Sequence, residues 1–367
     1  MEKERPRIAI LYLSYHCEPY IDDVIDAIAA LTYPKEQLAF VVIDNPHPEY
    51  GSSAPNLREK LQGVATPDLP EVTILAQAEN RGFSHGINVG IEWAIRHGFD
   101  YAFLHNDDGV MSPDAIEPLV ATMEAEPEVG IAQSLILLDP ERDLINSAGN
   151  ALHYCFFGFC ESYRESESSL DVPPVKDIAF ASGAAALLRI SCVEKCGKLD
   201  EDFFLYCEDL EYCCRLRLTG HRVVMVSESR FFHRYQFDRN NAKMYWIERN
   251  RYAVMLVTLR LPTLVVLLPI AAALEIGLFF FAWRRGWLAT RFKVYGYWLQ
   301  PSHWRLWWRK RRRVQKLRCV SDRDLLRLAV PRLEFQEQVI KSRLLDCFGN
   351  PLMALYYHVI VRSFVWW

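Results

Sequence analysis

The first 110 residues alternate short apolar runs with stretches of helical periodicity, and this alternation limits the fold more than any other feature. Near-continuous apolar runs are typical of parallel strands that are covered on both faces. Strands that alternate with helices predict an α/β fold with a mainly parallel, nucleotide-binding type of sheet. The predicted strands are residues 8–14, 40–45, 72–75 and 101–105, and the predicted helices are residues 20–31 and 84–97.

The fourth apolar run ends in two adjacent carboxylates, Asp107 and Asp108, directly after Asn106. Open α/β sheets bind ligands at the carboxyl ends of their strands. Two Asp side chains beside an Asn supply oxygen ligands that suit Mg²⁺ or Mn²⁺. The alternative is a polar turn in which Asp108 only ends the strand. Ser112-Pro113-Asp114 then predicts a helix start.

Three other segments bear on the fold. Residues 46–70 are rich in Pro, Gly and Ser and are predicted to form a long loop. Residues 80–90 hold three glycines around a predicted helix start, where backbone can approach a phosphate closely. Their spacing is not that of a P-loop or a dinucleotide fingerprint. Residues 180–188 are small and apolar, as in a strand against which a ligand or backbone packs.

A helix is predicted from Glu208 to Gly220, which would be its C-terminal glycine. Asp209 lies in the first turn of this helix, where the helix dipole stabilises a carboxylate. Glu211 and Arg215 are spaced to form an ion pair. These structural roles are the alternative to a catalytic role for the acids.

Charge is divided unevenly along the chain. Residues 1–240 hold 20 Lys and Arg against 39 Asp and Glu, whereas residues 241–367 hold 22 against 7. This split favours an acidic catalytic body with a basic appendage that seeks an anionic surface. We therefore predict a domain over residues 1–240 and a second region over residues 241–367.

The ten cysteines lack the paired spacing of a structural zinc site. No signal-peptide pattern precedes Ile8, because the opening residues are charged and the apolar run is short. The expectation is reduced, mostly buried thiols in a cytoplasmic catalytic body.

Residues 253–282 are apolar enough to reach across a bilayer, which needs about 20 residues. A single crossing would place the basic cluster of residues 309–313 opposite the catalytic body, against the positive-inside tendency. We therefore predict a re-entrant or interfacial helical pair, broken near Pro269. Six tryptophans between residues 283 and 308 suit the headgroup region, and the adjoining apolar run favours lipid over nucleic acid. The alternative is a soluble helical domain packed on the catalytic body or on a second subunit.

In this order, the blocks of residues 7–240 resemble family 2 glycosyltransferases with the GT-A fold. They are most similar to the bacterial rhamnosyltransferase-like branch that builds surface polysaccharides. The fixed order of many blocks carries the resemblance, and no single block does. The matching blocks are Ile8–Ser14, Val41–Asn45, Asn80–Gly90, Asn106–Asp108 with Pro113–Asp114, Ser182–Ala184, Gly197–Phe204 running into Glu208–Asp209, and His233.

The resemblance implies a role for each matched residue. Asp209 matches the catalytic base, and Asp108 matches the metal ligand because Pro113 follows it by five residues. His233, which would otherwise be a structural histidine, matches a second metal ligand. The residues implied to bind the donor are Asp44 at the base, Asn80, Gly82, Asn88, Asn106, Asp107 near the ribose, Ser182, Gly183 and Glu208.

Two departures from the family pattern qualify the resemblance. Asp209 is followed by Leu210 and Glu211 where relatives often have a second Asp, so a catalytic role for Glu211 does not carry over. The Gln-x-x-Arg-Trp motif of processive synthases is absent. Arg249 and Arg251 stand near its place, and we hypothesise that one of them binds diphosphate and that the enzyme adds one sugar per encounter.

The sequence thus predicts a metal-dependent, inverting glycosyltransferase at the cytoplasmic face of the cell membrane. It would use Mg²⁺ or Mn²⁺ and a nucleotide diphosphate sugar donor, with a lipid-linked or growing polysaccharide as acceptor. A homo-oligomer stays open, and no nucleic-acid partner is expected. The alternative is a non-catalytic GT-A scaffold subunit of a glycan-assembly complex. A nucleotidyltransferase is disfavoured because the chain lacks a Gly-rich N-terminal loop followed by Lys or Arg.

Overall fold

The computed structural model describes residues 5–62, 68–235, 241–334 and 343–367. Two compact units are present, and each is described by itself. The first comprises Met1–Gly149, Cys160–Phe204 and His221–Gln236, and the second comprises Asn150–Phe159, Leu205–Gly220 and Phe237–Trp367. The division at residue 240 into independent domains stays a prediction.

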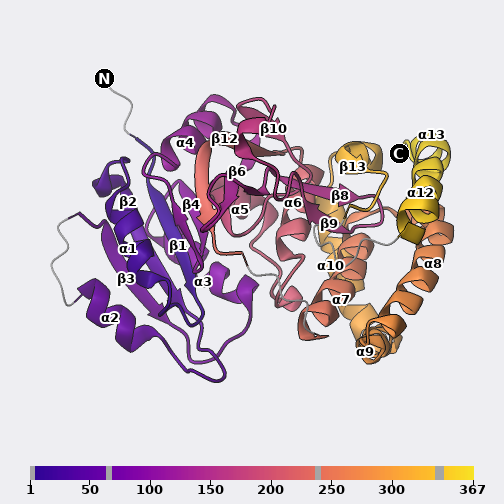
Figure 1. Ribbon diagram of the computed structural model, residues 1–367, viewed down its shortest axis with the longest axis horizontal. Coiled ribbons are helices and arrows are strands. Elements are labelled where there is room, and N and C mark those ends of the chain that lie inside the picture. Colours follow the sequence, from indigo (N-terminus) through magenta and orange to yellow (C-terminus); the bar gives the residue numbers. More distant parts are fainter. Residues whose placement is uncertain (1–4, 63–67, 236–240, 335–342) are drawn as a thin grey trace. The chain divides into compact units, whose positions relative to one another are not determined.

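The first unit is built on a mixed sheet that has ten strands within the described residues (Figure 1). Its strand order is β10-β12-β6-β11-β4-β1-β2-β3, with β5 paired to β12 and β7 paired to β6. Strands β1 to β4 run parallel, while β11 is antiparallel to both β4 and β6. The bounds are β1 Ile8–Ser14, β2 Leu38–Asp44, β3 Glu71–Ala76, β4 Tyr101–Asn106, β5 Gly109–Met111, β6 Val129–Leu138, β7 Ile145–Ser147, β10 Val175–Asp177, β11 Ala185–Arg189 and β12 Arg222–His233.

Every residue of β1 and of β2 is buried, as expected for parallel strands with both faces covered. Helix α3 packs closely on these strands, because a Cβ on Gly90 would lie 2.9 Å from Ile43 and 3.0 Å from Leu11. Helix α1 buries its apolar face into the main core. The helices of this unit are α1 Ile21–Ala29, α2 Ala54–Gln62, α3 Phe83–Arg96, α4 Ile116–Ala125 and α5 Ile190–Cys196.

Two predicted elements are corrected by the structure. Residues 46–70 are not one long loop, because α2 forms within them around the buried Leu57 and Leu61. The small residues 180–184 precede the strand rather than form it, and β11 begins at Ala185.

Strand β12 contains a bulge between Val226 and Arg230. These two residues pair with the adjacent Ser134 and Leu135 of β6, so three residues of β12 have no partner there. The buried Ser229 in the bulge donates to the carbonyl of Ala115 at 2.7 Å. After the bulge, the strand resumes pairing and ends at His233.

The second unit is mainly helical. Its helices are α6 Glu208–Leu218, α7 Asn241–Thr258, α8 Leu261–Arg284, α9 Leu288–Leu299, α10 Pro301–Leu317, α11 Asp322–Leu325, α12 Asn350–Tyr356 and α13 Arg362–Phe364. A small sheet is formed by β8 Asn150–His153, β9 Gly158–Cys160 and β13 Ala329–Val330. All ten cysteines of the chain are thiols outside disulfide bonds, and most of them are buried as predicted.

Helix α8 is continuous through Pro269, so the predicted break there is wrong. Pro269 removes one backbone hydrogen bond, the one to the carbonyl of Val265, and an apolar helix tolerates this loss. The neighbouring segment contacts the same turn, since the Tyr356 hydroxyl donates to the carbonyl of Val266 at 2.5 Å. Trp367 donates to Thr263 at 2.8 Å, and Figure 1 shows α12 and α13 beside α8.

Helix α8 is the one helix within the described residues that is long and apolar enough to cross a membrane, with a mean hydropathy of 2.5 and 11% of its apolar window buried. Its acidic residue Glu275 faces inward, where it pairs with Arg251 at 3.0 Å and also with Arg291. The outward face is therefore apolar. Its exposed large side chains are Leu261, Val265, Leu268, Ile276, Phe280 and Trp283.

Candidate active site

Three parallel strands of the first unit end at the same edge of the sheet. Leu13 on β1 lies opposite Asn106 on β4, and Ser14 lies opposite Asp44 on β2. The sheet topology therefore gathers the side chains that follow these strands, as predicted from the apolar runs.

Asp44 is fully buried at this edge and is engaged within the protein. Its carboxylate accepts hydrogen bonds from the Ser52 hydroxyl at 2.5 Å and from the backbone N–H groups of Ser53 and Ala54 at 3.2 Å. Ser14 donates at 3.3 Å. Asp44 thus joins β1 and β2 to the start of α2, where the helix dipole favours a carboxylate. Its role at the nucleotide base stays a prediction.

Asp107 supports the loop that follows β1. Its Oδ2 accepts from the backbone N–H of Tyr15 at 2.9 Å, and its carbonyl accepts from the Tyr12 hydroxyl at 3.2 Å. Burial raises the pKa of Asp107 to about 8, and the neighbouring Asp108 carboxylate adds to the rise.

Asp108 faces the imidazole of His233 across the two strand ends. Asp108 Oδ1 lies 2.9 Å from His233 Nε2 and accepts from the Asn106 amide at 3.2 Å. Burial alone would raise the pKa of Asp108, but His233 and the Asn106 amide hold it below its ordinary value. The residue that the motif spacing selected is thus the carboxylate that stays charged.

Asn146, which the sequence did not point to, orients His233. Its Oδ1 lies 2.9 Å from His233 Nδ1. Because an amide oxygen only accepts, Nδ1 carries a hydrogen and Nε2 is the ring atom left to face Asp108. At 2.9 Å a hydrogen on Nε2 bridges to the carboxylate, and a cation bound between the two would take the place of that hydrogen.

Asp108 and His233 fit a divalent cation that is shared with a substrate. Within residues 5–62, 68–235, 241–334 and 343–367, no three His, Cys, Asp or Glu side chains gather to hold a metal by themselves. Mg²⁺ is commonly bound by one or two carboxylates together with substrate phosphates and water. A donor set of one charged oxygen and one imidazole nitrogen therefore suits a cation whose remaining ligands come from a diphosphate.

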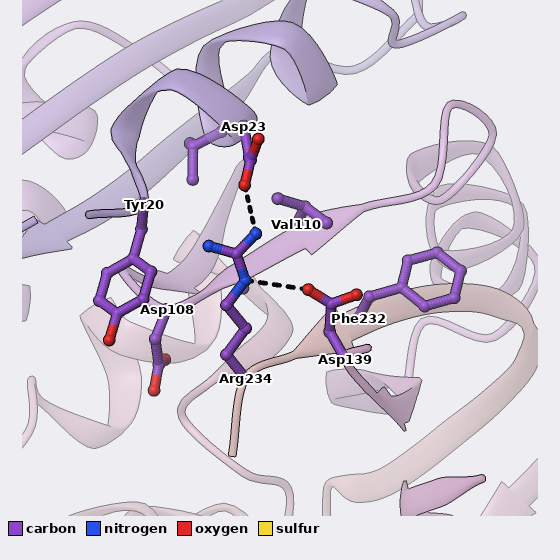
Figure 2. A pocket seen from close by; sticks show the side chains of 9 residues that line it. Tyr20, Asp23, Asp108, Val110, Asp139, Phe232 and Arg234 are labelled. Carbon is purple, nitrogen blue, oxygen red and sulfur yellow. Dashed lines mark hydrogen bonds and ion pairs between the residues drawn. The ribbon is translucent and has the colours of Figure 1, made fainter. Parts of the chain in front are cut away.

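A small pocket lies beside Asp108 (Figure 2). Figure 2 shows Arg234 between two carboxylates, Asp23 on α1 and Asp139 after β6. The Arg234 backbone N–H donates to the carbonyl of Asp108 at 2.8 Å. Arg234 therefore links α1 and the residue after β6 to the backbone of Asp108.

Gly82, at the start of α3, is required by packing. Its φ is +92°, and a Cβ there would lie 2.3 Å from the carbonyl oxygen of Phe204. Asn80 holds this turn, since its Oδ1 accepts from the Gly82 N–H at 2.8 Å. Close approach of protein backbone thus explains this glycine, and contact with a phosphate stays a prediction.

Asn88 on α3 is buried and binds the loop that precedes Phe204. Its amide exchanges two hydrogen bonds with the backbone of Leu199, at 2.9 and 3.0 Å, and donates to Glu201 at 3.1 Å. Glu201 also contacts His85 at 3.0 Å and Arg81 at 3.2 Å. Glu201 thus organises this region, although only its place in a matched block, and no predicted role, pointed to it.

Ser182 and Gly183 lie next to the carboxyl end of β4, because the antiparallel β11 starts where β4 ends. The Ser182 N–H donates to Gln133 at 2.8 Å, and the Asn106 N–H donates to the carbonyl of Ala184 at 3.0 Å. The structure therefore brings Ser182, Gly183, Asn106, Asp107, Asp108 and His233 to one region of the first unit.

Glu208 and Asp209 begin helix α6 in the second unit. Glu208 is 5% exposed, and its Oε2 has no hydrogen-bond partner within the described part of the chain. Burial, and then the charge of Asp209, raise the pKa of Glu208 well above its ordinary value. Asp209 Oδ1 accepts from the Leu210 N–H at 2.7 Å.

The predicted ion pair of Glu211 with Arg215 is confirmed at 2.6 Å.

Arg249 on α7 is buried, with 5% of it exposed, and points into its own unit. Its guanidinium lies over the rings of Trp246 and Tyr297, at 4.5 and 5.0 Å, and its Nε donates to Asn250 at 2.7 Å. These contacts account for Arg249 without a ligand. Binding of diphosphate by Arg249 stays a hypothesis.

Comparison with known proteins gives the chain its relatives. The family described as "Glycosyltransferase like family 2" matches residues 6–253. The low-salt glycan biosynthesis hexosyltransferase Agl10 of Haloferax volcanii is 23% identical over 252 residues, which make up 67% of this chain and 74% of that protein.

Two solved structures are similar to the chain. GalNAc-T7 with UDP, GalNAc and Mn²⁺ aligns with a TM-score of 0.54 at 12% identity, over 70% of this chain and 48% of that one. The mannosyltransferase PcManGT of Pyrobaculum calidifontis, in complex with GDP-Man and Mn²⁺, aligns with a TM-score of 0.47 at 19% identity, over 70% of this chain and 63% of that one. The chain thus spans less than two thirds of either. The likeness to GalNAc-T7 shows the fold alone, which is the predicted α/β GT-A fold, and helices follow it in this chain.

Proposed function

The chain belongs to the glycosyltransferase like family 2, and from that premise we propose that it is a metal-dependent, inverting hexosyltransferase of glycan biosynthesis. It moves a sugar from a nucleotide diphosphate sugar to a lipid-linked or growing surface glycan. The observation that carries the proposal is the Asp108–His233 pair, held at 2.9 Å at the carboxyl edge of the sheet. The sequence resemblance further favours the rhamnosyltransferase-like branch.

The first unit binds the donor in this proposal. Asp108 and His233 would hold Mg²⁺ or Mn²⁺ together with the diphosphate of the donor, and the cation would supply positive charge for the leaving diphosphate. Asp107 keeps the loop after β1 in place through the Tyr15 N–H. Asn80 and Asn88 act by shaping the segment around Gly82, because their hydrogen bonds are made within the protein.

Asp209 is the general base in this proposal. The acceptor hydroxyl oxygen bonds to the anomeric carbon while the bond from that carbon to the diphosphate oxygen breaks. The hydroxyl proton passes to the Asp209 carboxylate, and the nucleoside diphosphate leaves with the bonding electron pair. Attack from the face opposite the leaving group inverts the anomeric configuration, and a positioned base contributes roughly 10²–10⁴-fold to the rate.

Helix α8 supports a location at the cytoplasmic face of the membrane. Its exposed face is apolar, and helix α10 carries Arg309, Lys310, Arg312 and Arg313 toward its C-terminal half. Apolar area combined with basic residues binds anionic bilayers. We expect Phe280→Asp to move the protein from pelleted anionic liposomes to the supernatant, with the matched exposed change Tyr50→Asp as control. Equal pelleting of both variants would contradict this location.

The catalytic proposal is tested by turnover of the full chain. A panel of UDP, GDP and dTDP sugars is screened with Mn²⁺, first for thermal stabilisation and then for release of the nucleoside diphosphate. The configuration of the product is read by NMR. We expect release with at least one donor, and we expect Asp108→Asn and Asp209→Asn to abolish it while the circular dichroism spectrum is unchanged. Retained turnover in both variants would refute the assignment.

A further inference from the structure

The turn directly before α6 has an unusual backbone conformation. Tyr206 and Cys207 have φ values of +66° and +65°, in the left-handed backbone region that residues other than glycine rarely adopt. Such strained conformations persist only where the surrounding structure holds them, and they cluster at functional sites. Asp209 is two residues further on, so the direction of its side chain depends on residues 205–207.

Asn250 on α7 holds this turn. Its Nδ2 donates to the carbonyl of Leu205 at 2.9 Å and to the carbonyl of Tyr206 at 2.6 Å. Asn250 is fully buried, so water does not replace these bonds when they are lost. Cys207 adds a second contact with α7, since its Sγ lies 3.9 Å from the carbonyl of Ile247.

Arg249 determines which way the Asn250 amide faces. A guanidinium only donates, so the atom of Asn250 that lies 2.7 Å from Arg249 Nε is the oxygen, and the NH₂ group is left to face the turn. Arg249 itself is fixed by the rings of Trp246 on α7, Tyr297 on α9 and Trp307 on α10. Helices α7, α9 and α10 thus determine the conformation of the 205–207 turn through two side chains.

We propose that Asn250 is a positioning residue for Asp209. By holding the 205–207 turn, it sets the direction from which the Asp209 carboxylate meets the acceptor hydroxyl, and Arg249 keeps its amide in the required orientation. This inference rests on the proposed function, in which Asp209 is the base.

The experiment compares Asn250 with a matched amide elsewhere in the same unit. Gln315 on α10 also donates to two backbone carbonyls, those of Val257 and Thr258, both at 2.9 Å, and these carbonyls lie outside the turn. Asn250→Asp and Gln315→Glu each replace a donating amide by a carboxylate of the same shape. Asn250→Ala and Gln315→Ala remove the side chain and serve if the added charge prevents folding.

Two readouts are measured in the full chain. Hydrogen exchange of peptides covering residues 204–210 is expected to accelerate in the Asn250 variants and to stay unchanged in the Gln315 variants. The kcat for transfer is expected to fall about 10- to 100-fold in the Asn250 variants while the donor KM stays within about twofold, as for a misplaced catalytic group. The Gln315 variants should keep the wild-type kcat.

The possible outcomes test the hold on the turn, the positioning role and the proposed function separately. Unchanged exchange in both Asn250 variants would show that Asn250 does not hold the turn. Faster exchange with wild-type kcat, or an equal fall of kcat in the Gln315 variants, would overturn the positioning role and leave the proposed function standing. A wild-type protein without transfer would overturn the proposed function, and the exchange data would still decide whether Asn250 holds the turn.

Discussion

Two pairs of adjacent acids carry the proposed chemistry, Asp107–Asp108 in the first unit and Glu208–Asp209 in the second. In each pair, burial and a neighbouring carboxylate raise the pKa of the first member, to about 8 for Asp107 and well above its ordinary value for Glu208. The pairs differ in what supports the second member. Asp108 is surrounded by side chains, those of His233 and Asn106, whereas Asp209 is supported by backbone at the start of α6.

The difference matches two kinds of chemistry. A metal ligand needs other ligating side chains to converge on the same point, and the ends of neighbouring strands supply them. A general base needs a fixed direction, and a helix start held by a strained turn supplies it. Adjacent carboxyls whose environments differ can therefore divide their roles.

The largest expected difference between the pairs is in their response to metal. Asp108→Asn should weaken the apparent affinity for Mn²⁺ by more than about 100-fold, because a charged ligand is replaced by a neutral one. Asp209→Asn should bind Mn²⁺ as the wild type does, although its kcat is lost. The measurement is Mn²⁺ titration by calorimetry in the presence of a nucleoside diphosphate. Equal Mn²⁺ affinity in the two variants would remove the distinction between the pairs.

A smaller effect is expected from the residue that orients the histidine. Asn146→Ala should raise the Mn²⁺ concentration needed for half-maximal activity by about 10- to 100-fold, as is typical when the partner of a ligating histidine is lost. Saturating Mn²⁺ should restore kcat. Asn146→Asp keeps an oxygen that accepts from Nδ1 and should stay close to the wild type. A loss of kcat that persists at saturating Mn²⁺ would argue for a general structural role.

The smallest effect concerns the free energy of unfolding, which the ionisation of the buried Glu208 lowers. Its folded-state pKa is raised, so the folded chain binds this proton more tightly than the unfolded chain, and stability falls as pH rises above about 4.3, the ordinary value for Glu. Glu208→Gln should therefore be more stable than the wild type at pH 8, by on the order of 1 kcal/mol or more, and should lose this advantage near pH 4. Urea denaturation at the two pH values measures it. An advantage that is the same at both pH values would mean that ionisation is not its cause.

Much of the fold could be predicted because the buried parallel strands are near-continuous apolar runs. The predicted strand over residues 8–14 agrees with β1, and the run ending at residue 105 is β4 extended by one residue. Helix α2 was missed because its buried face consists mainly of Leu57 and Leu61 within a polar, proline-containing segment. The break at Pro269 was wrong because a proline costs one backbone hydrogen bond, while the helix continues on both sides of it from Leu261 to Arg284.

The site could be predicted only where its residues belong to motifs. Asp108 was selected over Asp107 by its spacing to Pro113, and the structure places it against His233. Asn146 and Asn250 were missed because their importance comes from what they contact in space, 87 residues away for His233 and about 45 for Leu205. No local sequence pattern marks a side chain whose function is to orient another one.

The bulge in β12 has a consequence for how relatives of this chain are aligned. The three unpaired residues between Val226 and Arg230 lie outside the ladder, so their number does not set the register of the strand beyond them. His233 is placed by its pairing with Gly109, which follows Asp108, and with Leu138, which precedes Asp139. Asp108 and Asp139 both line the pocket. A homologue with a shorter or longer bulge would thus keep its histidine at the same point in space. An alignment that counts residues from α6 would then misplace that histidine. An alignment of the last paired residues of β12 would find it.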